Sequence, residues 1–240
     1  MKKSLIIIFL SVVCTSVVQA QLSLNYRLGY GTYRMKSVSE FQDYILKESG
    51  LPAQIVEQFP GYLNHRLYFG MTENWPHYKV YLGYVTTGGR ISLVDYTGKW
   101  NFDMLLNGFQ AGFHMETPLN KNQKIELKGY IDLGVTTTML NINEYLKLYD
   151  EESEQSQLFF AYGFDFQLGL ELCCKFPVID VGCYLGYEQD FSTPFYLDGD
   201  YEIQLGTSQN DLVHPGWAGL RTGISATYTF GRKNTRSDQE

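Results

Sequence analysis

Strict alternation of apolar and polar side chains constrains the fold of this chain more than any other sequence feature. The stretch KIELKGYIDLGVTTTML (124–140) places Ile125, Leu133 and Val135 on one parity and Glu126 and Asp132 on the other. Side chains of a β-strand point alternately to opposite sides, so a period of two predicts one long strand with an apolar and a charged face. The fold then depends on which face meets water.

The same alternation recurs, and the sequence predicts eight strands, most of them of about 9–13 residues. Such lengths suit tilted strands that cross a bilayer, and an even number lets an antiparallel barrel close with both ends on one side. The eight segments are LSLNYRLGY (22–30), YLNHRLYFGM (62–71), YKVYLGYVT (78–86), LLNGFQAGFHM (105–115), KIELKGYIDLGVTTTML (124–140), YGFDFQLGLELC (162–173), VIDVGCYLGYEQDF (178–191) and AGLRTGISATYTF (218–230).

Short and long connections alternate strictly between these segments. The short links are TENWPH, TPLNKNQ and KFP, and the long ones cover 32–61, 87–101, 141–157 and 192–216. Outer-membrane barrels have short periplasmic turns and long extracellular loops. The sequence therefore predicts an all-β, eight-stranded antiparallel transmembrane β-barrel, located in the cell outer membrane.

In this interpretation the apolar face meets lipid and the charged face fills the lumen. An eight-stranded barrel is about wide enough for side chains alone, so we expect ion pairs rather than an open channel. A soluble lipocalin-like barrel is the structural alternative, but the glycine-rich charged face would make a poor soluble surface. The predicted inward residues are Arg27, Arg66, Lys79, Gln110, Glu116, Lys124, Glu126, Lys128, Asp132, Asp165, Gln167, Glu171, Asp180, Glu188, Asp190 and Arg221.

The N-terminus has the three parts of a secretory signal. Two lysines precede a short apolar core (5–13), and Val-Gln-Ala ends at Ala20, where we expect cleavage before Gln21. A lipoprotein would instead be lipidated at Cys14, but the preceding residue, Val13, is not small. Residues 1–20 are thus predicted to be a signal peptide.

Charge and cysteine content limit the partners. The net charge of −7 disfavours nucleic acid, because phosphate binding needs a basic patch. The odd set Cys173, Cys174 and Cys183 follows the predicted cleavage site, so we expect free thiols rather than a disulfide framework.

The connections contain several local motifs. Ser37 and Glu40 fit a capping box, and a helical period predicts a helix over 38–48. Gly88 and Gly89 predict a tight bend or bulge. Acidic residues attract hard cations, but their spacing matches no calcium loop, so no metal site or cofactor is predicted. These acids are Asp150, Glu151, Glu152, Glu154, Asp198, Asp200, Glu202 and Asp211.

No catalytic residues are predicted. His65, His77 and His114 lack an adjacent serine or a zinc-type partner. Asp211 and His214 are close in sequence, without an evident third member. The chain is therefore not expected to be an enzyme.

The whole pattern resembles the small outer-membrane β-barrel proteins of Gram-negative bacteria, of the OmpA/OmpX-like kind. The ending ISATYTF, with its terminal Phe230, is similar to the assembly signal of that family, and the resemblance covers 21–230. It implies a monomer in outer-membrane lipid with a structural or surface-binding role, whose long loops meet an extracellular, host or matrix ligand. The alternatives are a small pore and a lipid-modifying enzyme. We interpret residues 231–240 as a polar tail.

Overall fold

The computed structural model describes residues 22–71, 77–96, 98–120, 124–149, 151–208 and 211–231. The predicted signal peptide and residues 232–240 of the tail lie outside these ranges. None of the helical segments in the described part is long and apolar enough to span a membrane.

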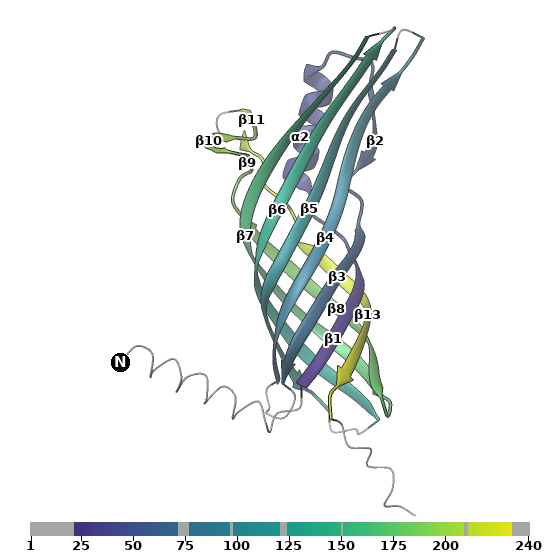
Figure 1. Cartoon of the computed structure of the whole chain (residues 1–240), viewed down its shortest axis with the longest axis vertical. Coiled ribbons are helices and arrows are strands. Elements are labelled where there is room, and N and C mark those ends of the chain that lie inside the picture. The colour runs from purple at the N-terminus through teal and green to yellow at the C-terminus, as the bar shows by residue number, and fades with distance from the viewer. Residues whose placement is uncertain are drawn as a thin grey trace, which may run out of the picture.

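Eight antiparallel strands form a closed barrel (Figure 1). Neighbouring strands pair in the order β7-β6-β5-β4-β3-β1-β13-β8, and pairing of β8 with β7 closes the ring. The eight strands confirm the predicted fold class. They are β1 (Leu22–Gly31), β3 (Tyr62–Met71), β4 (His77–Val94), β5 (Gly98–Pro118), β6 (Ile125–Leu148), β7 (Glu151–Lys175), β8 (Ile179–Ser192) and β13 (Gly219–Thr229).

The two faces of the barrel wall differ as predicted. Leu133 and Leu168 point outward and are 42% and 49% exposed, whereas the neighbouring Asp132 and Gln167 are buried inside. An exposed apolar girdle around a closed sheet is the surface of a transmembrane barrel, because every backbone polar group in lipid needs a partner within the sheet. Lys124 is the exception among the predicted inward residues: it is exposed and lies just before β6 begins.

The strands β4 to β7 are much longer than predicted. They have 18, 21, 24 and 25 residues, about twice what a bilayer needs. The predicted loops 87–101 and 141–157 are therefore wrong: most of each is a continuation of the strands on both sides. Figure 1 shows the two resulting hairpins projecting well past the rest of the barrel.

The apolar face switches sides along these long strands. Below the switch, Leu82 on β4 and Phe109 on β5 point outward; above it, Ile91 and Met104 point inward and are buried. Polar Arg90 and Asp103 take the outer face at that level and pair with each other. This inversion marks where lipid ends and water begins, because each environment requires the opposite face to be apolar.

Helix α2 (Lys36–Glu48) packs into the upper core. Its position confirms the predicted helix, but the predicted capping box is wrong. No side chain caps the first turn, and Ser37 instead donates to the carbonyl of Leu212 and accepts from the backbone N–H of His214. The first turn is thus fixed by the last extracellular connection rather than by its own sequence.

The predicted bend at Gly88 and Gly89 is also wrong, because both residues pair regularly with β5. β2 (Gln54–Gln58) adds to the free side of β4 at this level. The ring of the buried Phe59 occupies the space where a Cβ of Gly89 would lie, 2.7 Å from the nearest ring atom. Glycine is needed here for close packing rather than for a turn.

The last long connection holds β9 (Tyr196–Leu197), β10 (Asp200–Gln204), β11 (Gly206–Ser208) and β12 (Asp211–Leu212). Together with α2, β2 and the upper parts of β4 to β7 it forms a body beyond the bilayer. We call this body the extension; it comprises residues 32–61, 85–107, 138–161 and 191–218.

The inversion can be tested with one substitution on each side of the switch. We expect Leu133→Arg, in the lipid-facing girdle, to lower the free energy of unfolding by about 2–4 kcal/mol in lipid vesicles. Asn143→Arg lies on the same outer face of β6, ten residues higher and opposite Asp103, and should change it by less than about 0.5 kcal/mol. Equal effects in a urea titration would disprove the inversion.

Candidate functional site

The lumen contains a network of buried ion pairs centred on Arg66. Its guanidinium lies 3.0 Å from Asp132 and also bonds Glu188, which in turn lies 3.2 Å from Arg221. Gln110 accepts from Arg66 and donates to Glu188 at 2.8 Å. A charge buried in a narrow lumen is tolerated when it is paired in this way.

A second cluster lies nearer the end of the barrel at which β1 begins and β13 ends; we call it the terminal end. Glu116 bridges Lys79 and Lys128, at 2.9 and 3.1 Å, and His114 spans the gap between Glu116 and Asp132. Arg27 pairs with Glu171 at 2.5 Å and lies over the ring of Tyr130, 4.2 Å from its centroid. The predicted filling of the lumen by ion pairs is confirmed.

An aromatic residue closes the lumen above these charges. The Trp217 side chain is fully buried and donates from Nε1 to Thr138 at 2.8 Å. Tyr33 meets its ring edge-on at 5.0 Å, and the guanidinium of Arg221 lies under Tyr33, 4.7 Å from the ring centroid. The top of the polar network thus meets the bottom of an apolar core.

That core fills the extension. Val38 and Phe41 of α2 pack with buried residues of the hairpins, so the concave side of the sheet is covered rather than open. The hairpin residues of this core are Val85, Ile91, Trp100, Phe102, Met104, Leu106, Leu140, Ile142, Phe159 and Ala161. The lumen is therefore filled by charged side chains, and a packed apolar core covers it on the side of the extension.

The extension is strongly acidic. Its four ranges hold 15 acidic and 6 basic residues in the sequence. Three of the basic residues are paired within the extension, in Lys36–Glu40, Arg90–Asp103 and Lys147–Glu152. A surface of this sign attracts cations and cationic partners and repels polyanions.

The acidic residues singled out in the sequence are spread over exposed strands. Glu151, Glu152 and Glu154 begin β7, whereas Asp200 and Glu202 lie on β10. In the part of the chain that the structure describes, no three His, Cys, Asp or Glu side chains form a group that could hold a metal ion. Asp150 lies outside the described residues.

The structure does not bring Asp211 and His214 together as a catalytic pair. The side chain of Asp211 is exposed, whereas His214 Nδ1 lies 3.1 Å from the carbonyl of Ser192. His65 bonds the hydroxyl of Tyr26 on the lipid-facing wall. The thiols of Cys173, Cys174 and Cys183 are free, on β7 and β8.

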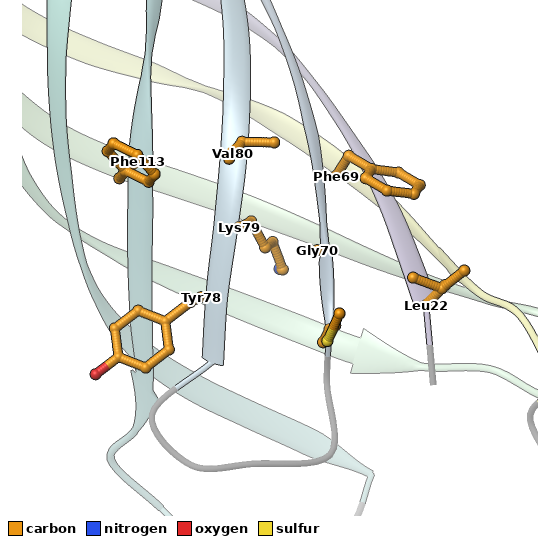
Figure 2. A pocket seen from close by; sticks show the side chains of 8 residues that line it. Leu22, Phe69, Gly70, Tyr78, Lys79, Val80 and Phe113 are labelled. Carbon is orange, nitrogen blue, oxygen red and sulfur yellow. The ribbon is translucent and has the colours of Figure 1, made fainter. Parts of the chain in front are cut away.

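A hollow of about 440 Å³ lies on the lipid-facing wall near the terminal end of the barrel (Figure 2). Phe69, Val80 and Phe113 line it, and Lys79 lies between β4 and β3, beside Gly70. Because Lys79 is paired with Glu116 inside, the hollow offers lipid a mainly apolar surface. It is part of the lipid girdle.

The sequence interpretation missed a groove at the far tip of the extension. The groove, about 390 Å³ in volume, is lined by Leu51, Pro52, Leu93, Asp95, Gly98, Lys99, Trp100, Glu144, Leu146 and Leu148. The signal for it was present: apolar residues continue at every second position of β5 and β6 beyond the switch, but on the opposite parity.

No protein-family profile and no curated protein matches the sequence. Among solved structures the chain is similar to Ail, the attachment invasion locus protein of Yersinia pestis, alone and in complex with the heparin analogue sucrose octasulfate. The complex has a TM-score of 0.35 and 13% identity over 88% of this chain and 100% of that chain. The uncomplexed structure has a TM-score of 0.33 and 14% identity over 88% and 99% of the two chains.

Neisserial surface protein A is also similar, with a TM-score of 0.31 and 10% identity over 86% of this chain and 94% of that chain. Because all these scores lie below 0.5, the barrel fold is established by the strand pairing of this chain itself and not by the likeness.

Removing the central arginine should destabilise the barrel strongly. Arg66→Leu removes one ion-pair partner from each of the buried carboxylates Asp132 and Glu188, so we expect a loss of about 3–5 kcal/mol in the free energy of unfolding. Arg90→Leu breaks an exposed pair of the same chemistry and should cost about 0–1 kcal/mol. Equilibrium unfolding in vesicles measures both; similar losses would show that the lumen network is not needed for stability.

Proposed function

We propose that the protein is a monomeric outer-membrane β-barrel that presents its extension as a binding surface for an extracellular ligand. Residues 1–20 direct export and are removed after Ala20, and 21–230 fold into the membrane. Closed transmembrane barrels with long extensions on one side are the outer-membrane type.

One observation carries this proposal, the inversion of the apolar face along β4 to β7. Leu82 and Phe109 face lipid, whereas Ile91 and Met104 above them are buried in a core that α2 completes. The chain thus builds an ordered body in water from strands that the bilayer does not require. Binding sites are commonly carried by such segments on a rigid scaffold.

The composition of the extension points to the kind of ligand. A polyanion such as the sucrose octasulfate of the Ail complex would meet 15 acidic and 6 basic residues here, so polyanion binding is disfavoured. The proposal assigns no catalytic residue: His114 is buried between two carboxylates, and His214 bonds a backbone carbonyl.

The pore alternative is tested by planar-bilayer recording of the refolded protein. We expect no steady conductance steps, because paired charges fill the lumen and Trp217 closes its upper end. Steady steps whose ion selectivity changes when Lys128 or Asp132 is neutralised would contradict this and establish a pore.

The binding role is tested by shortening the hairpins. Gly88 pairs with Leu105 and Ile142 with Gln157, so Asn-Gly turns can replace 89–104 and 143–156 at these levels. Bacteria that display the full chain should adhere to matrix-coated plates or cultured host cells at least tenfold better than bacteria with the shortened barrel. Heat-modifiable migration checks that the shortened barrel has folded.

Equal adhesion by bacteria with the full chain, the shortened folded barrel and no barrel would overturn the proposed function. Equal adhesion with the full chain and the shortened barrel, but none without a barrel, would contradict the role of the extension and place the binding surface on the remaining rim.

A further inference from the structure

We propose that the groove at the tip of the extension binds a cationic amphipathic peptide segment of an extracellular protein. Apolar side chains of the segment fill the groove, and flanking Lys or Arg side chains lie on its acidic rim. This inference rests on the proposed function and specifies the ligand of the extension.

The groove is the uncovered end of the core of the extension. Its floor is Trp100, which is buried, and Leu93 and Leu146 pack partly against the same core. Toward the tip the covering ends: Leu51 is 40% exposed and Leu148 is 45% exposed. The concave face therefore stays apolar beyond the point at which the chain covers it.

An apolar hollow in an aqueous compartment is costly unless a partner covers it. Its volume of about 390 Å³ is within the usual range of ligand sites. In the membrane such a surface would meet lipid. This groove instead lies on the concave side of the sheet, at a level where the outer face is polar. Exposed apolar surface of this kind typically marks an interaction site.

Charged groups at the groove select the sign of the partner. Glu144 lines it and accepts a hydrogen bond from Trp100 Nε1 at 2.8 Å, which fixes the carboxylate beside the apolar floor. Asp95 lines the opposite side, and Glu151 pairs in register with Leu148 at the rim. Lys99 is the basic lining residue, and its ammonium lies 5.8 Å from the centroid of the Tyr145 ring.

Other occupants fit less well. β1 begins and β13 ends at the end of the barrel opposite the tip of the long hairpins, so both ends of the described chain are far from the groove (Figure 1). A second copy of the chain would bring its own acidic extension, and like charges repel. A cationic partner satisfies both the apolar floor and the acidic rim.

The experiment uses the full-length barrel in nanodiscs of neutral lipid and fluorescently labelled synthetic peptides. The test peptide is Lys-Ser-Lys-Leu-Leu-Lys-Ser-Lys; one control replaces both leucines with serine, and another replaces all lysines with glutamate. Fluorescence anisotropy should show saturable binding of the test peptide and at least tenfold weaker binding of each control peptide. Empty nanodiscs measure peptide binding to lipid.

Two groove variants are compared with two matched variants elsewhere on the extension. Leu148→Ser should weaken the test peptide about tenfold, and Glu144→Gln about fivefold, since glutamine keeps the acceptor for Trp100 but removes the charge. Glu202→Gln and Ile203→Ser make the same changes on exposed β10 and should stay within twofold of the natural chain.

Absent binding, equal binding of the serine or glutamate peptide, or unchanged affinity of both groove variants would overturn the inference. The adhesion experiment separates this failure from that of the proposed function. If the groove variants adhere as the natural chain does while the shortened barrel does not, the ligand binds elsewhere on the extension and only the groove assignment is wrong.

Discussion

The bilayer offers the backbone no hydrogen-bond partner, and the rest of this structure depends on how the chain meets that constraint. Pairing of β7 with β8 closes the sheet, so every strand in the lipid has two neighbours. Closure with eight strands leaves a narrow lumen, and the inward side chains must fill it. Asp132 and Glu188 can be buried there because two cations, Arg66 and Arg221, pair with them.

The strands β4 to β7 have opposite distributions of apolar and polar side chains in their lower and upper parts. In the lower part the apolar side chains face out and the charges face in; in the upper part the faces exchange. Trp217 lies where the two regimes meet, with Arg221 bonded to its carbonyl on one side and apolar residues on the other. Gly108 makes room for it, because a Cβ there would lie 3.1 Å from the indole. The same strands thus build both a membrane barrel and a body in water with its own apolar core, without a linker between them.

Most of the barrel could be predicted from the sequence, because few structures besides a two-faced β-strand produce an apolar pattern with a period of two. The upper ends of β4 to β7 could not, because the apolar side chains change parity along these strands. Ile91 and Trp100 continue the alternation on the other parity, and a fixed-parity interpretation assigns them to loops. The capping box failed for another reason: Ser37 bonds residues 212 and 214, about 175 positions away, and no local pattern shows such contacts. The groove combines three segments, and the sequence shows only the apolar alternation of its strands and not their meeting with residues 51–52.

The continuity of the long hairpins has a mechanical consequence. β6 and β7 run from the tip to the far end of the barrel in one unbroken register, from the pair Leu148–Glu151 to the pair Ile125–Cys174. Inter-strand hydrogen bonds lie perpendicular to the strands, so tension on this hairpin shears the ladders with β5 and β8 across many bonds at once instead of opening them one after another. A pull on the tip is therefore carried into the lipid-embedded wall, and the resisting element is the whole ladder rather than a hinge.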